Sequence, residues 1–227
     1  MPGAVVEEGA VVILNGEPVT VGTDVLYRVG ETVVGVELCE DFFAPVAPSQ
    51  FMALSGAEVI VNLAASPEQA GKKAGRADQI KAYSEKIKAV YAYVSAGATE
   101  STADLVYSGH SMIVENGTVL KENENLIDSD YMIVADCDLG RVRADRNKIG
   151  CFDGVPGENY LDTDVYGDFL RSDGSLYPLR KLSFVPNTKE ERIQRCLEIF
   201  QTQVTGLKQR LATIKSNAVI GISGGLD

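Results

Sequence analysis

Cys39 is the residue whose type and position in this chain most clearly suggest chemistry. It follows the apolar run Val33 to Leu38, which is typical of a buried strand, and it precedes Glu40. A nucleophile at the end of a strand is exposed, and the N–H group after it can point at a developing oxyanion. Most cysteines are instead small buried thiols, so the position alone leaves both interpretations open.

A candidate phosphate loop lies at the other end of the sequence. The apolar run Ala218 to Ile222 predicts a buried strand that leads into Ser223-Gly224-Gly225. Glycines let backbone N–H groups approach an anion, and a helix that followed would add its positive N-terminus. An ordinary strand followed by a Gly-Gly turn is the open alternative.

The other reactive side chains exclude several kinds of site. Besides Cys39, the chain has three cysteines, which are Cys137, Cys151 and Cys196, and no two of the four form a CxxC pair. Because the chain also has a single histidine, a zinc site is not expected. Scattered cysteines in a chain of 227 residues are typical of reduced thiols in a cytosol.

Four further segments carry motifs: Cys39-Glu40-Asp41-Phe42-Phe43, residues 62–67 (NLAASP), residues 95–102 (SAGATEST) and residues 109–117 (GHSMIVENG). They resemble the glutaminase domain of the glutamine-dependent NAD⁺ synthetases, which belongs to the nitrilase (carbon–nitrogen hydrolase) superfamily. That family also carries a synthetase domain with a Ser-Gly-Gly-x-Asp-Ser pyrophosphate loop. Residues 223–227 match the loop in sequence and in order along the chain.

The resemblance implies a fold and a domain order. Residues 1–150 would be the C-terminal part of a glutaminase domain, an α/β fold with an incomplete nitrilase-like α-β-β-α layered sandwich. Residues 151–187 would be a linker. Residues 188–227 would form the first helix and strand of a Rossmann-like PP-loop domain, the ATP pyrophosphatase type.

The resemblance also implies roles for the residues around the cysteine. Cys39 would attack the side-chain amide of glutamine, form a thioester and release ammonia. The backbone N–H of Glu40 would help to hold the oxyanion. Glu40, Phe43 and Ser66 would hold the glutamine.

Two basic positions and the histidine need separate interpretations. Lys72 falls where the family often has a basic residue for the substrate carboxylate, but a solvated Lys72–Lys73 pair is an open alternative. The segment is not a Walker loop, because Ser66 stands in place of its first glycine and Lys73 in place of its serine or threonine.

Nitrilase-type enzymes use a glutamate base and a lysine, so His110 is expected to be structural.

The second domain would consume the ammonia. There ATP would adenylate the nicotinic acid carboxylate of deamido-NAD⁺, and ammonia would displace AMP to give NAD⁺. Ser223, Gly224, Gly225 and Asp227 would cradle the pyrophosphate, with Mg²⁺ offsetting its charge. The implied partners are glutamine, deamido-NAD⁺ and ATP, in a cytoplasmic homo-oligomer.

The chain departs from the family before Cys39. No lysine precedes it, and none of the preceding glutamates (Glu7, Glu8, Glu17, Glu31 and Glu37) lies in a motif like that of the family's base. We therefore expect a fragment cut at both ends. A non-catalytic nitrilase-like module would also fit this departure, whereas a free-standing amidase would have no use for the loop at residues 223–227.

The elements that must position these residues follow from periodicity and turns. Asn15-Gly16 and Asn116-Gly117 each predict a two-residue hairpin. Apolar runs predict strands at 32–38, 59–63, 91–96 and 131–137, and the patterns predict helices at 48–56 and 76–90. Thr188 and Glu191 form a capping box, which predicts a helix from residue 188.

Composition limits the partners. The net charge is −11 and no basic run occurs, which argues against nucleic acid. No apolar stretch approaches the ~20 residues of a membrane helix, so we expect a soluble protein that does not contact membranes.

The missing base and lysine lead to a prediction. A thiol with an unperturbed pKa of ~8.5 is mostly protonated at neutral pH and needs a neighbouring base. This chain alone should therefore release little or no ammonia from glutamine. A coupled ammonia assay checks this, and turnover comparable to that of a full-length synthetase would contradict it.

Overall fold

The computed structural model describes residues 9–69, 71–97, 100, 105, 107–123, 131–152, 160–166, 185 and 188–225. The chain divides into two units, residues 1–178 and residues 179–227. Glu7, Glu8, Asp227 and parts of the motif at residues 95–102 lie outside the described residues.

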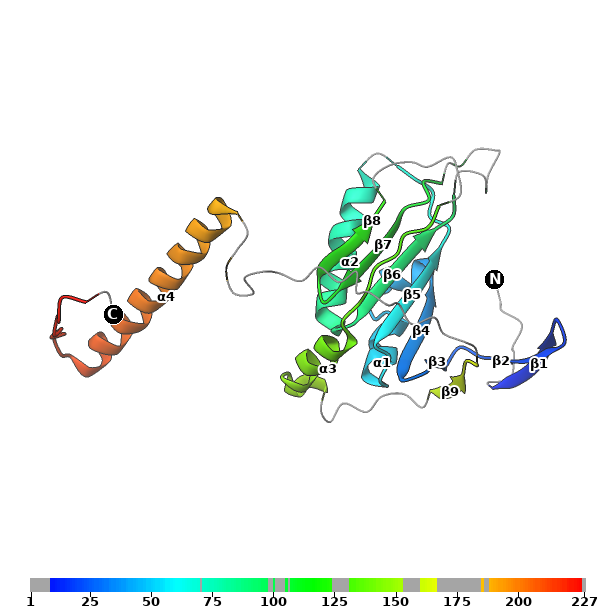
Figure 1. The fold of residues 1–227 in the computed structure, drawn as a ribbon, viewed down its shortest axis with the longest axis horizontal. Helices are drawn as coiled ribbons and strands as arrows, with labels where there is room; N and C mark the ends of the chain where they lie inside the picture. Colours follow the sequence, from blue (N-terminus) through cyan, green and yellow to red (C-terminus); the bar gives the residue numbers. More distant parts are fainter. Residues whose placement is uncertain are drawn as a thin grey trace. The chain divides into compact units, whose positions relative to one another are not determined.

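The first unit is built on a seven-stranded mixed sheet (Figure 1). Its order is β8 (Thr118–Glu122), β7 (Ser111–Glu115), β6 (Val90–Ser95), β5 (Val59–Ala64), β4 (Thr32–Leu38), β3 (Val25–Val29) and β9 (Leu161–Asp164). Strands β4, β5 and β6 run parallel, as do β3 and β9, and the other neighbours run antiparallel. The carboxyl ends of β4, β5 and β6 therefore meet at one edge of the sheet.

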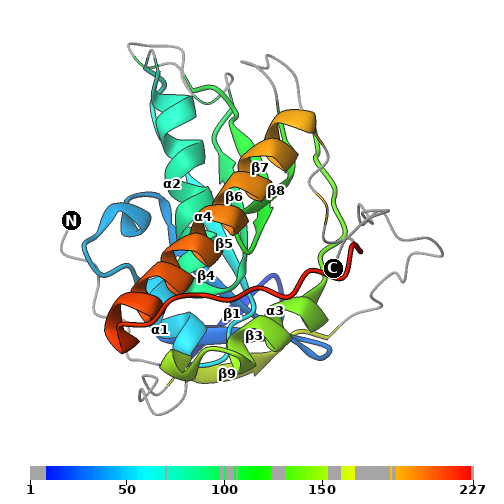
Figure 2. The ribbon, with the colours of Figure 1, turned by 90° about the vertical axis from the view of Figure 1, so that its left-hand side faces the viewer.

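Helices α1 (Pro48–Leu54) and α2 (Lys72–Ile87) cover one face of this sheet (Figures 1 and 2). Side chains from both layers form the core, where Ile60, Ile80, Tyr91, Met112 and Val114 are fully buried. Helix α3 (Leu139–Asn147) follows later in the chain and buries Val142. The α/β fold class is confirmed, with a mixed sheet and a helical layer in the described residues.

Both hairpins predicted from Asn-Gly are confirmed. Asn15 and Gly16 have φ of 52° and 89°, and they join β1 (Ala10–Leu14) to β2 (Glu17–Val21). Asn116 and Gly117, with φ of 44° and 81°, join β7 to β8. Positive φ at both central residues is what a type I′ turn requires.

Two predicted strands are wrong, and one helix has different bounds. Residues 131–137 and 218–222 form no strand, because neither run pairs with a described strand. Helix α2 begins before residue 76 and ends at Ile87, since Lys88 takes the left-handed conformation (φ 48°) that terminates a helix. Val90 consequently belongs to β6.

The segment predicted as a linker, residues 151–187, contains a strand. β9 pairs in parallel with β3, with Val25 opposite Leu161, and so extends the sheet at its edge. Its sequence, Leu-Asp-Thr-Asp, is too short and polar to show a strand pattern. The domain boundaries themselves stay a prediction.

The sheet face opposite α1 and α2 is apolar and partly open. In one row Leu38 pairs with Leu63 and Leu63 with Val94, and these side chains are 59%, 48% and 43% exposed. The described residues thus supply one helical layer and one sheet of the layered sandwich that the sequence predicted.

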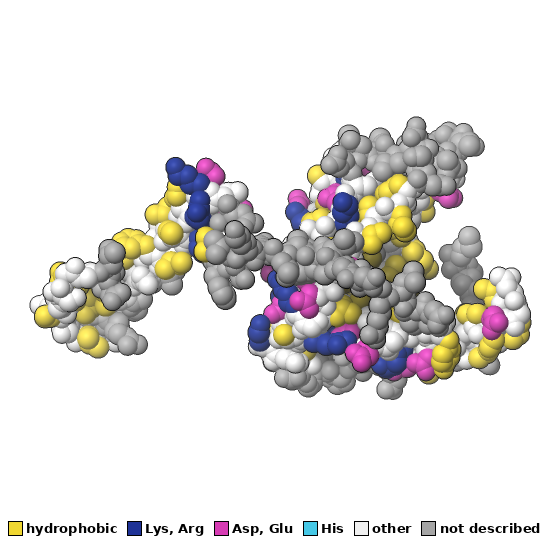
Figure 3. Space-filling view, viewed as in Figure 1, with side chains coloured by type: hydrophobic (Ala, Val, Ile, Leu, Met, Phe, Trp, Pro, Cys, Tyr) yellow, Lys and Arg dark blue, Asp and Glu magenta, His cyan; other side chains and the backbone are white. Residues whose placement is uncertain are grey.

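The second unit contains helix α4 (Lys189–Ile214), which begins as predicted. Thr188 Oγ1 accepts the N–H of Glu191 at 3.1 Å, and Glu191 Oε2 accepts the N–H of Thr188 at 3.5 Å. Its apolar stripe is exposed and visible in Figure 3, with Ile193, Leu197, Phe200, Val204, Leu207 and Ile214. No helix among the described residues has the length and apolarity to cross a bilayer.

Arg146 of α3 ties the ends of two other helices together. Its Nη2 donates to the carbonyl of Ala57 at 2.6 Å and its Nε to that of Lys88 at 2.8 Å. Ala57 and Lys88 follow the C-termini of α1 and α2, where carbonyl groups lack helical partners and the helix dipole favours a cation. The Arg146 guanidinium also lies 5.2 Å from the ring centroid of Phe152.

We predict that Arg146→Ala lowers the free energy of unfolding by about 2–4 kcal/mol, because charged hydrogen bonds to buried carbonyls are lost. Lys148→Ala, at an ion-paired but 72% exposed side chain of the same segment, is the control and should cost about 0–0.5 kcal/mol. Urea unfolding measures both, and equal effects would contradict the role of Arg146.

Candidate active site

Cys39 lies where β4 ends and a short 3₁₀ helix, η1 (Cys39–Phe43), begins. Its φ is +42°, a conformation that few non-glycine residues adopt. The turn is held on both sides: Leu38 N–H donates to Asp41 Oδ2 at 2.9 Å, and buried Phe42 packs edge-to-face on Tyr83, 5.3 Å between centroids. The predicted place of Cys39 at a strand end is confirmed.

The strand register shows which polar residues lie on the helix-covered face just before Cys39. Side chains alternate along a strand, so Glu37 points to the face opposite that of Leu38. Glu37 pairs with Asn62, and Asn62 pairs with Tyr93. These three polar side chains lie in one buried row beneath α1 and α2, one step inside the edge where Cys39 sits.

Glu37 is the hub of that row. Its Oε2 accepts the N–H of Ser49, in the first turn of α1, at 3.2 Å. Its Oε1 accepts a short hydrogen bond from the Tyr91 hydroxyl and a longer one from Asn62 Nδ2 at 3.5 Å. Burial and the Glu37 charge raise the pKa of Tyr91, so its hydroxyl stays a donor. One carboxylate thus connects β4, β5, β6 and α1.

The loop after β5 carries the predicted substrate residues. Ser66 is buried two residues beyond the end of β5. Lys72 Nζ donates to the carbonyl of Pro67 at 2.7 Å, and Lys73 Nζ donates to that of Asn123 at 2.6 Å. The alternative of a solvated lysine pair is wrong, because both ammonium groups are bound to backbone and half-buried.

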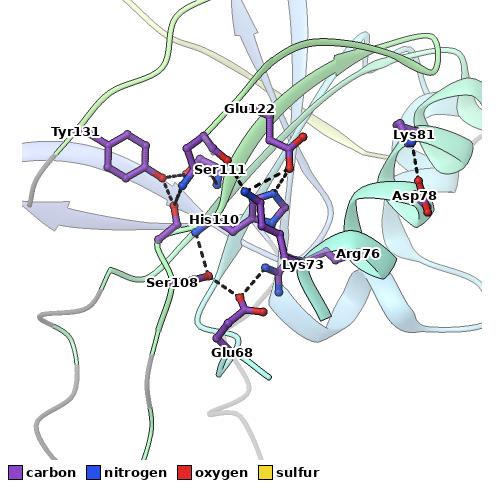
Figure 4. A network of polar contacts seen from close by, with 12 residues as sticks. Glu68, Lys73, Arg76, Asp78, Lys81, Ser108, His110, Ser111, Glu122 and Tyr131 are labelled. Atoms are coloured by element: carbon purple, nitrogen blue, oxygen red, sulfur yellow. Dashed lines mark hydrogen bonds and ion pairs between the residues drawn. The ribbon is translucent and has the colours of Figure 1, made fainter. Parts of the chain in front are cut away.

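A buried polar network supports this loop (Figure 4). Arg76 Nη2 donates to Glu68 Oε2 at 3.0 Å, and Ser108 Oγ donates to the same oxygen at 2.6 Å. Burial disfavours the Glu68 carboxylate, but the hydrogen bonds from Ser108 and Arg76 outweigh it and lower the pKa. The guanidinium of Arg76 also lies 5.3 Å from the centroid of the Tyr93 ring.

His110, for which we predicted a structural role, is fully buried at the centre of this network. Its Nδ1 accepts from Arg76 Nε at 2.8 Å, and its Nε2 lies 2.9 Å from Glu122 Oε1. Since Arg76 can only donate, the proton of the neutral ring is on Nε2 and points to Glu122. Burial is the largest cause that lowers the pKa of His110.

The structure brings some of the predicted site residues together. Cys39 and Ser66 follow the carboxyl ends of the neighbouring parallel strands β4 and β5. Glu40 and Phe43 are exposed on η1, directly after Cys39. The roles of these residues in binding glutamine stay predictions.

The predicted phosphate loop belongs to the second unit. Gly224 has a positive φ (85°), and Gly225 N–H donates to Ser223 Oγ at 3.4 Å. The binding of a phosphate by this turn stays a prediction. No cluster of metal ligands occurs among the described residues.

Sequence reasoning missed the polar residues that surround the cysteine. Glu37, Asn62 and Tyr93 each interrupt or end a run of apolar strand residues. A polar side chain within a buried apolar run indicates a hydrogen-bonded contact in the core, because it must find a partner there. That interruption was the available signal.

Comparison with known proteins places the chain in one family. The sequence model of the family described as carbon–nitrogen hydrolase matches residues 8–147. A glutamine-dependent NAD(+) synthetase of Mycobacterium tuberculosis is 36% identical over 234 residues, which cover 97% of this chain and 34% of that protein. The synthetase of Thermotoga maritima is 31% identical over 216 residues, 88% of this chain and 33% of that protein.

A solved glutamine-dependent NAD(+) synthetase of Cytophaga hutchinsonii matches 51% of this chain and 18% of its own, with 28% identity and a TM-score of 0.43. This chain spans about a third of the length of the curated relatives it matches.

The buried His110 yields a pH prediction. Its native pKa lies below the ordinary 6.5, so the unfolded chain binds this proton first as the pH falls. The contribution of the neutral His110 ring to the free energy of unfolding is therefore fully present above pH 6.5. It is lost as the pH falls toward the native pKa. Because the chain has one histidine, its imidazole NMR signals are unique. A native midpoint at or above 6.5 would contradict the assignment.

Proposed function

Because the chain belongs to the carbon–nitrogen hydrolase family, we propose that Cys39 is the nucleophile of a site that hydrolyses the side-chain amide of glutamine. The observation that carries this proposal is the position of Cys39. It is a half-buried thiol at positive φ on the carboxyl edge of parallel strands, followed by a tight turn. The identity to glutamine-dependent NAD(+) synthetases over nearly the whole chain supports the choice of amide.

The proposed reaction has two steps. The Cys39 thiolate attacks the amide carbon, a C–S bond forms, and the electron pair of the carbonyl moves to its oxygen, where the N–H of Glu40 holds it. The proton that left the Cys39 thiol is passed by the base that took it up to the amide nitrogen. When the carbonyl re-forms, the C–N bond breaks and the nitrogen leaves as ammonia. Water then cleaves the thioester to glutamate and free thiol.

Around the reacting atoms we assign glutamine binding to Glu40, Phe43, Ser66 and Lys72. The hydrogen bond of Lys72 to the Pro67 carbonyl supports a role through the loop. A substrate carboxylate at Lys72 would have to share or replace this bond. Proton transfer at Cys39 needs a base, and no residue before Cys39 matches the family's base motif. We therefore propose that this chain has little activity alone.

For the whole protein, we propose that the ammonia amidates deamido-NAD⁺ to NAD⁺ in a step driven by ATP. Ser223, Gly224, Gly225 and Asp227 would hold the pyrophosphate of ATP, with Mg²⁺ as counterion. The sequence Ser-Gly-Gly and the positive φ of Gly224 support this part.

A chloromethyl ketone analogue of glutamine tests the nucleophile. It should alkylate Cys39 on the order of tenfold faster than the analogue of asparagine, because only the longer chain places its carbonyl at the thiol. Peptide mass mapping identifies the labelled cysteine. Equal rates for the two analogues, or a label on Cys137, Cys151 or Cys196 instead, would overturn the proposal.

A further inference from the structure

Tyr93 carries a buried hydroxyl that the fold does not use. The side chain is 2% exposed, and its oxygen has no hydrogen bond of normal geometry among the described residues. Buried Tyr91 and partly buried Tyr83 differ in this respect. Tyr91 donates to Glu37, and the Tyr83 hydroxyl lies 2.8 Å from Ser49 Oγ.

A phenylalanine at position 93 would fill the same space without this cost. Leaving a hydroxyl buried and unpaired costs free energy, because its bonds to water are lost on folding. The ring itself has a structural purpose, since it packs beneath the Arg76 guanidinium and 5.8 Å from the His110 ring. The ring explains the aromatic residue, whereas the oxygen makes no hydrogen bond of normal geometry with a described residue.

The strand register places Tyr93 near the edge of the sheet where Cys39 lies. Leu38 pairs with Leu63 and Leu63 with Val94, so Cys39 directly follows the residue of β4 that is level with Val94. Tyr93 directly precedes Val94, on the face of the sheet that the helices cover.

Two electrostatic effects agree with this placement. Burial raises the pKa of Tyr93 most, Arg76 lowers it, and the charge of Cys39 raises it. The Ser95 hydroxyl is close enough to lower the pKa of Tyr93, although the two hydroxyls make no hydrogen bond of normal geometry. The net effect is a phenol that keeps its proton at neutral pH and can therefore donate.

We propose that Tyr93 is a catalytic residue, whose hydroxyl donates a hydrogen bond to the carbonyl oxygen of the amide attacked by Cys39. This inference rests on the proposed function. As the C–S bond forms, the electron pair that moves to the carbonyl oxygen is stabilised by the Tyr93 O–H and the Glu40 N–H. The phenol keeps its proton throughout, and Arg76 above the ring offsets part of the developing negative charge.

The test compares Tyr93→Phe with Tyr91→Phe. Tyr93→Phe removes only the unpaired oxygen, so the free energy of unfolding should be unchanged or higher. Alkylation of Cys39 by the glutamine chloromethyl ketone should slow by about tenfold or more, since a donor to the oxyanion is lost. A small aromatic disulfide, which has no carbonyl to bind, should react with Cys39 within about twofold of the wild-type rate.

Tyr91→Phe is the matched control on the same strand and face. It removes the donor to Glu37 and should lower stability, because the buried carboxylate loses a partner.

Each of the other outcomes would contradict either the proposed function or the proposed role of Tyr93. If the wild-type chain shows no preference for the glutamine analogue at Cys39, the proposed function fails. If the wild-type chain shows this preference, but Tyr93→Phe is alkylated as fast as the wild type, only the role of Tyr93 fails. If Tyr93→Phe slows both reagents equally, or loses stability as Tyr91→Phe does, the hydroxyl positions the thiol or the fold and is not catalytic.

Discussion

The buried carboxylate of Glu37 is the constraint on which the rest of the site depends. It accepts hydrogen bonds from the first turn of α1, from Tyr91 on β6 and from Asn62 on β5, while its own strand is β4. A buried anion must keep these donors close, because an unpaired charge in the interior is very costly. The donors come from three separate elements, so their relative positions are set together. Cys39 lies two residues after Glu37, directly after the end of β4. The start of its turn is therefore held in place by the same hydrogen bonds.

The two faces of the sheet consequently have different chemistry. The face beneath α1 and α2 carries polar side chains near the carboxyl edge and apolar ones, such as Ile60 and Met112, deeper in the core. On the opposite face, the paired residues of β4 and β5 carry only aliphatic side chains, with Leu38 and Leu63 among the more exposed ones. Near Cys39 the polar side chains of β4 and β5 therefore lie on the face that the helices cover.

Much of this arrangement could be predicted from the sequence. Asn-Gly turns require positive φ at both central residues, so both hairpins were predictable from the dipeptides alone. Apolar runs located β4 and β5 because both faces of these two strands carry mostly apolar side chains. Pairing over long distance could not be predicted: β9 is a strand only because the edge of β3 accepts it, whereas the more apolar run at residues 218–222 finds no partner. The motifs located Cys39 and Ser66, but the row of Glu37, Asn62 and Tyr93 exists only once three strands are in register.

The central claim is that a glutamine molecule binds with its amide at Cys39. The most direct measurement is the rate at which each cysteine reacts with iodoacetamide, read by mass spectrometry, with and without L-glutamine. We expect that L-glutamine slows the alkylation of Cys39 alone, and that this effect saturates as the glutamine concentration rises. Exposed Cys151 and Cys196 should be unaffected, and Cys137, whose thiol pKa is raised to about 11 by burial, should stay slow throughout. An unchanged rate at Cys39, or equal slowing of the exposed thiols, would contradict it.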